Sequence, residues 1–341
     1  MSLHDGIRAG GKHSYEDFGL EIASREIGLP EKKSIRKTVP FMSGFYDFTT
    51  LNGAPTWGER QIKYAFDLIG ATVEEMDAER TEVVNWLCNL HDVDIFDDSI
   101  PDYHFRGSYD SYSLSEDGEH VELTVVFVCY PFMLSNTPSV STVYESASVT
   151  IANSGRPASP TISSAQAAII AAGGQQKSVP PVGNYKAGLM LGAGNNIVTV
   201  TKQNEIRYPY VNTTTTNNGI TFTDNGDGTI TANGTATEVA WFWLWGSGAK
   251  FKPPVGKHRA TGCPANASAN NYRIQYYVYN GSDADSKYYY DFGSGVVIDV
   301  TEKTEYISLA IRVVKGYTAS NVVFSPAMYG ETKIVFAKEV L

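Results

Sequence analysis

The order of apolar and polar residues over the first 134 positions predicts strands on both sides of one helix. Residues 13–49 alternate apolar and polar side chains between Gly and Pro breaks, and residues 59–70 alternate without interruption; both patterns are typical of strands. Residues 72–90 repeat apolar side chains every three or four positions, which predicts a helix of about four turns. Residues 94–118 and 120–134 return to strands, and the apolar run in the second predicts burial on both faces.

The pattern changes again in the second half of the chain. Residues 148–162 and 189–201 indicate strands with turn formers around them, and after Gln203 the composition shifts to Thr, Asn and Gly. Residues 205–331 hold short, evenly spaced apolar segments between turn signals, which predicts an all-β sandwich. Residues 332–341 alternate once more and predict a final strand.

Composition supports a globular, mainly β protein. The chain has 341 residues, of which 42% are hydrophobic and 19% charged, with 31 Gly and 21 Tyr; this favours strands and tight turns in two or three domains. No apolar run approaches the roughly 18–20 residues of a membrane span. The net charge of -10 and the pI of about 5.1 argue against a basic nucleic-acid-binding face.

The termini and the cysteines indicate synthesis in a reducing cytoplasm. Residues 1–15 carry charges and lack the apolar core of a signal peptide. Cys88, Cys129 and Cys263 lie far apart and form no CxxC pair. We therefore expect neither a disulfide framework nor a cysteine metal site.

Four segments stand out within residues 1–134: SYEDFGLEI (14–22), ERQIKYAFDLIG (59–70), VVNWLCNL (83–90) and VELTVVFVCYPFML (121–134). Through these segments, residues 1–134 resemble the N-terminal domain of the distal tail protein (Dit) family of long-tailed phages that infect Gram-positive bacteria. In that family this domain assembles as a hexameric ring at the tip of the tail tube. The basic stretch Pro30–Lys37 is expected to be a solvated loop rather than a partner site.

The same resemblance implies a galectin-like second domain that contains a third domain as an insertion. Residues 148–162 and 189–201 look like strands of the galectin-like domain, which in the family ends soon afterwards with a terminal strand. We therefore expect residues 135–203 and 332–341 to form that domain, with 204–331 inserted into it. A simple third domain at the C-terminus, ending at Leu341, is the alternative. The inserted segment resembles carbohydrate-binding modules, through NGITFTDNGDGTITANGTAT (218–237), YRIQYYVY (272–279) and NVVFSPAMYG (321–330).

The stretch AWFWLWGSG, from Ala240 to Gly248, contains three of the five tryptophans. In a strand, Trp241, Trp243 and Trp245 share one face, and Phe242 and Leu244 share the other. Since both faces are apolar, one of them must be core. Either the indoles form a platform on which the C–H faces of a sugar stack, or they are the core and a loop covers the other two residues.

Residues 272–279 provide a second strand with two different faces. The side chains at 272, 274, 276 and 278 suit a core, whereas those of Arg273, Gln275, Tyr277 and Tyr279 mix donors, acceptors and rings. Such a mixture is typical of sugar-binding faces, although tyrosine-rich strands are also common in sandwiches. The candidate carbohydrate-binding residues are Trp241, Trp243, Trp245, Arg273, Gln275, Tyr277 and Tyr279.

Catalytic and metal-binding patterns are not found in the sequence. There is no GxSxG, HExxH, P-loop or GxGxxG motif in a suitable context, and the six His are dispersed. Residues 224–229 (DNGDGT) predict a hairpin turn and lack the spacing of an EF-hand loop. We therefore expect no catalytic residue, metal or cofactor. The acidic loop Asp92, Asp94, Asp97, Asp98 and Asp102 is interpreted as solvated rather than as a pair of catalytic carboxylates.

These inferences together predict a structural virion protein, not an enzyme. The fold expected is mainly β: an N-terminal β-sandwich with one α-helix, a galectin-like β-sandwich, and an inserted β-sandwich of carbohydrate-binding-module type. The protein would be a ring hub in the tail tip or baseplate of a phage or prophage, and its inserted module would aid adhesion to host cell-wall glycans. The expected partners are further copies in a hexamer, other tail proteins (tail tube, tail-associated lysin or fibre, receptor-binding protein) and host cell-wall polysaccharide, without nucleic acid or membrane insertion.

Two alternatives remain open. The first is a pure assembly hub whose inserted sandwich contacts other baseplate proteins and binds no sugar. The second is a cell-wall hydrolase. A ring-forming N-terminal half separates the hydrolase from the two hub hypotheses, and glycan binding separates those two from each other.

Overall fold

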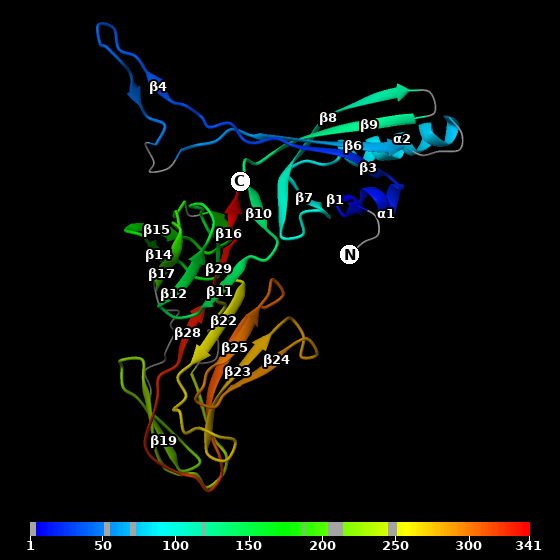
Figure 1. Cartoon of the computed structure of the whole chain (residues 1–341). Coiled ribbons are helices and arrows are strands. Elements are labelled where there is room, and N and C mark those ends of the chain that lie inside the picture. Colours follow the sequence, from blue (N-terminus) through cyan, green and yellow to red (C-terminus); the bar gives the residue numbers. More distant parts are fainter. Residues whose placement is uncertain are drawn as a thin grey trace.

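The computed structural model describes residues 5–50, 55–68, 73–117, 120–186, 188–203, 214–244 and 251–341. The protein is mainly β, as predicted, and its strands form several antiparallel sheets. Figure 1 shows three tiers: an N-terminal sheet, a smaller sandwich beneath it, and a third set of strands at the far end. Each tier has its own hydrophobic core, so burial of apolar surface stabilises the three separately.

The first tier is a long sheet with one helix against it. The helix α2 (Val73–Cys88) turns Val83 and Leu87 into the sheet, where both are fully buried, and Trp86 donates from Nε1 to the carbonyl of Ala9 at 3.0 Å. The strand order is β2 (Lys12–His13), β1 (Ile7–Ala9), β7 (Val93–Asp97), β8 (Tyr103–Asp117), β9 (His120–Cys129), β6 (Arg60–Leu68) and β3 (Glu21–Ile27).

A second, short helix interrupts the region that was predicted to be strands only. The helix α1 (Ser14–Phe18) begins after His13, whose Nδ1 accepts from the backbone N–H groups of Tyr15 and Glu16 at 3.2 Å. It ends at Gly19, which has a left-handed φ of 69°. These two caps satisfy the ends of a helix that is too short for hydrophobic periodicity to detect.

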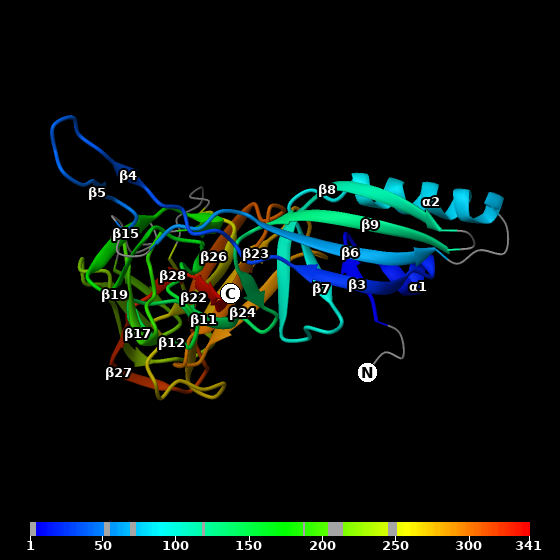
Figure 2. The ribbon, with the colours of Figure 1, turned by 45° about the horizontal axis from the view of Figure 1, so that its top comes forward.

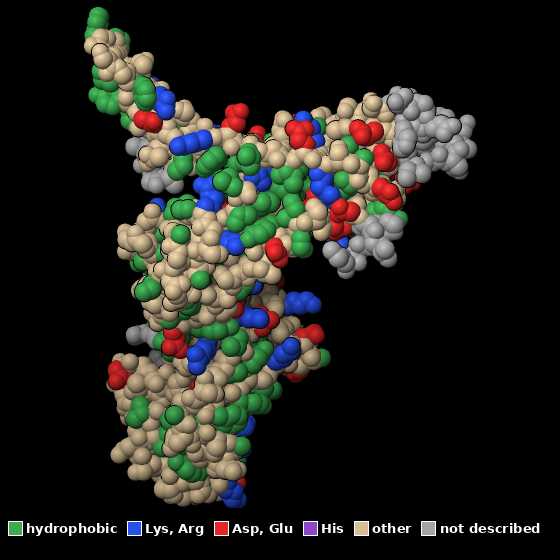
Figure 3. Space-filling model, in the orientation of Figure 1, with side chains coloured by type: hydrophobic (Ala, Val, Ile, Leu, Met, Phe, Trp, Pro, Cys, Tyr) green, Lys and Arg blue, Asp and Glu red, His purple; other side chains and the backbone are tan. Residues whose placement is uncertain are grey.

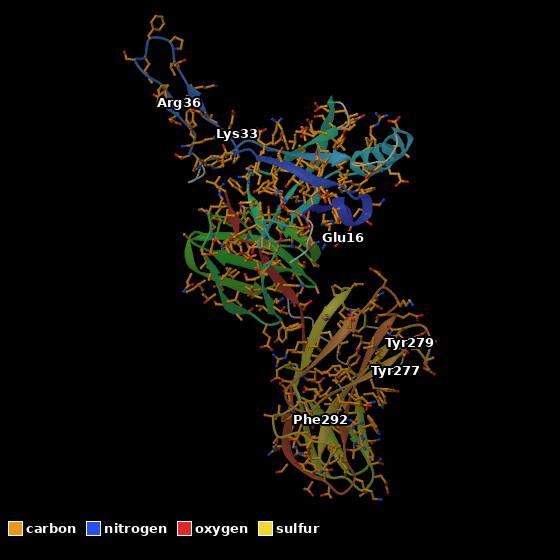
Figure 4. All side chains as sticks on the ribbon, turned by 45° about the vertical axis from the view of Figure 1, so that its right-hand side comes forward. Glu16, Lys33, Arg36, Tyr277, Tyr279 and Phe292 are labelled. Atoms are coloured by element: carbon orange, nitrogen blue, oxygen red, sulfur yellow. The ribbon has the colours of Figure 1, made fainter. Side chains whose placement is uncertain are left out.

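The strands β3 and β6 continue beyond the sheet as an arm, whose described residues are 28–50 and 55–58. The arm carries the bridge between Lys32 and Trp57 and the short pair β4 (Arg36–Lys37) and β5 (Tyr46–Asp47). Figure 2 shows it projecting away from all three tiers, and Figure 4 places Lys33 and Arg36 along it. The prediction of a solvated loop at Pro30–Lys37 was therefore incomplete, because this stretch is one limb of a β-hairpin.

The second tier is a sandwich of two four-stranded sheets, into which the end of the chain is built. The strand β29 (Thr332–Phe336) lies between β11 (Ser139–Val143) and β13 (Thr161–Ser164). The next strand, β30 (Glu339–Val340), pairs with β10 (Met133–Ser135) of the first tier. One sheet has the order β11 (Ser139–Val143), β29 (Thr332–Phe336), β13 (Thr161–Ser164) and β16 (Val182–Lys186). The other has the order β12 (Ala147–Asn153), β17 (Gly194–Lys202), β14 (Ala168–Ala172) and β15 (Gln175–Val179), and the last strand of the chain is β30 (Glu339–Val340).

The third tier lies between β17 and β29 in the chain and contains three sheets. The strands β19 (Ile220–Asp224) and β20 (Ile230–Thr235) form a hairpin, which confirms the turn predicted at 224–229. In this turn the backbone N–H of Asn225 donates to the carbonyl of Thr229 at 3.0 Å. The first sheet is β18 (Thr215–Asn217), β19 (Ile220–Asp224), β20 (Ile230–Thr235) and β27 (Thr318–Phe324). The second is β21 (Ala240–Trp243), β26 (Tyr306–Val313), β23 (Tyr272–Tyr279) and β24 (Lys287–Asp291), and the third is β25 (Val296–Val300), β22 (Gly256–Thr261) and β28 (Ala327–Gly330).

The second and third tiers are joined by a short, hydrogen-bonded junction. Only Glu331 separates β28 from β29, and its backbone donates to the carbonyl of Lys257 at 2.8 Å. Lys202, at the end of β17, donates from Nζ to the carbonyl of Gly330 at 2.6 Å and also to the Thr332 hydroxyl. These bonds hold the third tier against the sandwich that carries it.

The buried ammonium at this junction predicts a dependence of stability on pH. Burial lowers the pKa of Lys202 to about 8 from its ordinary 10.5. Since the folded state loses this proton first, Lys202 should raise the free energy of unfolding relative to that of Lys202→Met as pH increases from about 8 toward 10.5. Urea unfolding of the wild type and of Lys202→Met at several pH values tests this; the rise should disappear in the variant, and equal slopes for both proteins would contradict it.

Candidate functional site

The tryptophan strand turns its indoles away from the core of the third tier. Phe242 is 6% exposed and Leu244 3%, whereas Trp243 is 55% exposed and Trp241 is half-buried. Phe242 packs face to face on Phe222 of the opposing sheet, with ring centroids 5.2 Å apart. The structure therefore decides between the two alternatives: Phe242 and Leu244 are core, and Trp241 and Trp243 are not.

The neighbouring strands alternate in the same way. On β23, the four residues predicted to be core are at most 1% exposed, and on β26 the apolar side chains of Ile307, Leu309 and Ile311 are also buried. The other side of the sheet β21–β26–β23–β24 is here called the outer face. Its members are Trp241, Trp243, Arg273, Gln275, Tyr277, Tyr279, Tyr288, Tyr290, Tyr306, Ser308, Ala310 and Arg312.

The register of the four strands fixes which side chains of the outer face are neighbours. One row across the sheet contains Trp241, Arg312 and Arg273. The next row begins with Trp243 and ends with Gln275 and Tyr290, and Ala310 lies between them. Ser308 and Ala310, at the middle positions of β26, have small side chains, so the larger aromatic rings on the neighbouring strands make up most of this surface.

Aromatic rings on the outer face lie against one another in pairs. Trp241 and Trp243 stack with centroids 5.7 Å apart and planes at 15°. Tyr277 lies 4.6 Å from Tyr288, and Figure 4 shows Tyr277 and its neighbour Tyr279 together on the outside of the domain. Broad, flat rings with polar edges offer both stacking surface and hydrogen-bond donors, which is what recognition of a sugar ring requires.

Hydrogen bonds hold several of these side chains in place. The Tyr277 hydroxyl donates to Oδ1 of Asp283 at 2.7 Å, and the Tyr279 hydroxyl donates to the carbonyl of Gly281 at 2.9 Å. Arg273 donates from Nη2 to Oε1 of Gln275 at 3.0 Å. Because these groups are already ordered, binding would cost less conformational entropy.

The structure brings most of the candidate residues together and adds others. Arg312 was missed, although the alternation of residues 306–313 places it opposite the buried isoleucines. Tyr288 and Tyr290, on β24, were also not among the predicted candidates. Trp245 lies outside the described residues. The candidates that share the outer face are Trp241, Trp243, Arg273, Gln275, Tyr277 and Tyr279.

The acidic loop of the first tier has structural partners rather than a free pair of carboxylates. Asp97 is buried and accepts from the Tyr64 hydroxyl and from Nε of Arg25, both at 3.0 Å. Asp92 accepts two bonds from the guanidinium of Arg106, at 2.8 and 3.0 Å. Asp97 therefore corrects the interpretation of a solvated acidic loop, whereas Asp92, Asp98 and Asp102 are exposed as expected.

A hollow of about 690 Å³ lies between the first two tiers. It is lined by Arg106, Lys186, Glu339 and the thiol of Cys129, among others. Burial raises the pKa of the Cys129 thiol to about 12, so this group stays protonated at neutral pH and is a poor nucleophile. The hollow therefore contains no activated cysteine.

Two further kinds of site can be described for the part of the chain that the structure covers. Among the described residues, no three His, Cys, Asp or Glu side chains are grouped so that they could hold a metal ion. Neither described helix is long and apolar enough to cross a membrane. Cys88, Cys129 and Cys263 are free thiols.

Comparison with solved structures finds chains that are similar to this one. The crystal structure of the SPP1 Dit (gp 19.1) protein, described as a paradigm of the hub adsorption apparatus in Gram-positive infecting phages, is similar to this chain with a TM-score of 0.41 and 13% sequence identity, over 99% of each chain. No protein-family model and no curated protein matches the sequence.

Proposed function

We propose that the protein is a ring-forming hub in the tail tip of a phage or prophage, with an inserted domain that binds cell-wall glycans of a Gram-positive host. The sequence patterns of residues 1–134 support the hub. The position of β29 between β11 and β13 supports an insertion at 204–331, because the chain leaves and re-enters one sandwich. The protein acts, in this proposal, by assembly and adhesion rather than by catalysis.

The observation that supports assembly is the exposed apolar surface of the arm. A hairpin of two strands has no core of its own and is marginal in water, and the ring of Phe41 is fully exposed at the tip. Figure 3 shows hydrophobic side chains gathered at this end of the molecule. An exposed apolar surface of this kind is typical of a site that binds another protein. The exposed apolar side chains of the arm are Leu29, Ile35, Val39, Phe41, Met42, Phe45, Tyr46 and Phe48.

We propose that the partner of the arm is a second copy of the chain, and that six copies close a ring. An arm that reaches a neighbour in the same direction at every contact makes a head-to-tail interface, and such an interface closes into a ring when the rotation permits. Sedimentation velocity over a wide concentration range tests this. A discrete species of six chains is expected, and a monomer at every concentration would contradict the ring.

The observation that supports adhesion is the outer face of the third tier. It presents paired rings with polar groups between them on rigid strands, and Trp243 and Tyr288 are each 55% exposed. Six copies of a weak site on one ring would bind a repeating polymer far more tightly than one copy alone. A pure assembly hub would instead use the same face to contact a baseplate protein.

Removing one indole should separate these two hypotheses. We expect Trp243→Ala to weaken binding of the full chain to wall polysaccharides about 5- to 30-fold, the equivalent of about 1–2 kcal/mol, since exposed aromatic anchors carry much of such contacts. Tyr277→Ala should act in the same direction. Val323→Asp, on the separate sheet of β27, is the control and should bind like the wild type.

The measurement is fluorescence or calorimetric titration with polysaccharides from a panel of Gram-positive walls. Circular dichroism establishes that each variant remains folded. Saturable binding that falls in both aromatic variants supports adhesion. Absence of binding by the wild type across the panel would favour the pure assembly hub.

A further inference from the structure

One end of the outer face holds two positive charges directly opposite each other. Arg273 on β23 and Arg312 on β26 are partners in the antiparallel register. Like charges in this position repel each other and destabilise a sheet. Within the described part of the chain, neither guanidinium forms an ion pair with a carboxylate, so the repulsion is not relieved by the protein.

Aromatic rings position both guanidinium groups. Cζ of Arg273 lies 4.3 Å from the ring centroid of Tyr290, and Cζ of Arg312 lies 5.8 Å from that of Trp241. Cation–π contacts of this kind orient a cation while leaving its charge in place. The two arginines are therefore fixed by the same rings that we propose as the stacking surface.

Arg273 is also incompletely satisfied. Its Nη2 donates to Gln275, but its Nε is shielded from solvent and has no hydrogen-bond partner in the structure. Burial, and then the nearby charge of Arg312, lower the pKa of the Arg273 guanidinium. An anion between the two arginines would relieve the repulsion.

We propose that Arg273 and Arg312 together bind an oxyanion, a phosphodiester or carboxylate group carried by the wall glycan, while the adjoining rings stack on its sugar or polyol units. Guanidinium groups match the geometry of both kinds of oxyanion with pairs of N–H donors. This inference rests on the proposed function of the outer face and names the chemical class of its ligand. Because the net charge of the chain is -10, binding of an anion requires a local concentration of positive charge, which this pair provides.

Three probe polymers test the proposal on the full chain: a polyol-phosphate wall polymer, a uronic-acid polysaccharide and neutral dextran. The wild type should bind at least one charged polymer more tightly than dextran. Arg273→Gln and Arg312→Gln should each weaken that binding about tenfold or more. Added salt should weaken binding of the wild type more than that of either variant.

Lys287→Gln is the matched control, because it removes one positive charge from the same sheet. Lys287 lies in register with the buried Val278, on the side away from the outer face, so this variant should bind like the wild type. The two charged polymers distinguish phosphate from carboxylate as the preferred group.

The possible outcomes separate this inference from the proposed function. If dextran binds as tightly as the charged polymers, or if the arginine variants bind like the wild type while Trp243→Ala does not, the anion site is overturned and glycan binding stands. If none of the polymers binds, both proposals fail. We expect Arg273→Gln and Arg312→Gln to weaken binding of a charged polymer while Lys287→Gln does not, and we expect neither arginine variant to change binding of dextran.

Discussion

Replacing Phe41 and Phe45 with aspartate should convert the proposed ring to monomers. Both rings are exposed in the single chain, and burying a Phe side chain at an interface stabilises it by about 1.5–3 kcal/mol. Losing both, and adding two charges, should weaken association of neighbouring chains more than a hundredfold, at about 1.4 kcal/mol per factor of ten. Sedimentation velocity of the double variant and the wild type, at matched concentrations, measures this change.

The arm variant should remain folded, because these two side chains contribute to none of the three cores. Phe41 also has a φ of 68°, a left-handed conformation that is rare for a bulky residue. Phe is therefore not favoured by the backbone at this position, and its replacement should not destabilise the arm through the backbone. Val323→Asp places the same charge at an exposed apolar position far from the arm and should leave the mass distribution unchanged. An oligomer that persists in the double variant would exclude the arm as the contact.

Phe242→Ala should destabilise the third tier far more than Trp243→Ala, although the indole is the larger side chain. Truncating a buried Phe costs about 3–5 kcal/mol, from lost transfer free energy and the cavity left behind. Phe242 is 6% exposed and packs on Phe222, whereas Trp243 is 55% exposed and contacts mainly Trp241. An exposed substitution of that kind should cost less than about 1 kcal/mol.

Hydrogen–deuterium exchange in peptides from β23 and β26 is the suitable measurement. A chain with three cores need not unfold in one step, and exchange reports the opening of the affected sheet alone. Faster exchange in Phe242→Ala than in Trp243→Ala is expected. The reverse order would show that the indoles, and not Phe242, hold the third tier together.

Much of the strand pattern could be predicted from the sequence, since period-two alternation is a local signal. It was correct for residues 272–279, and it correctly divided Trp241 and Trp243 from Phe242. It could not decide which side was core, because that depends on the neighbouring strand. Ile307, Leu309 and Ile311 lie on the Phe242 side of β26, and no local pattern reveals that pairing.

The arm and the arginine pair escaped prediction for different physical reasons. The aromatic residues of 41–48 resemble a core segment, and nothing local shows that they project into solvent. Arg273 and Arg312 are far apart in the sequence and become neighbours only through strand register. The domain boundaries at 204 and 331 and the carbohydrate-binding role of the outer face remain proposals.

The central claim, that a ring presents several weak glycan sites at once, is tested most directly by co-sedimentation with purified Gram-positive cell walls. Three full-length proteins should be compared: the wild type, the monomeric Phe41→Asp/Phe45→Asp variant, and Trp243→Ala. If multivalency operates, the wild type should bind the walls at least about a hundredfold more tightly than the arm variant does. Trp243→Ala should bind weakly although it forms the ring. Equal binding by the wild type and the arm variant, or undiminished binding by Trp243→Ala, would contradict the claim.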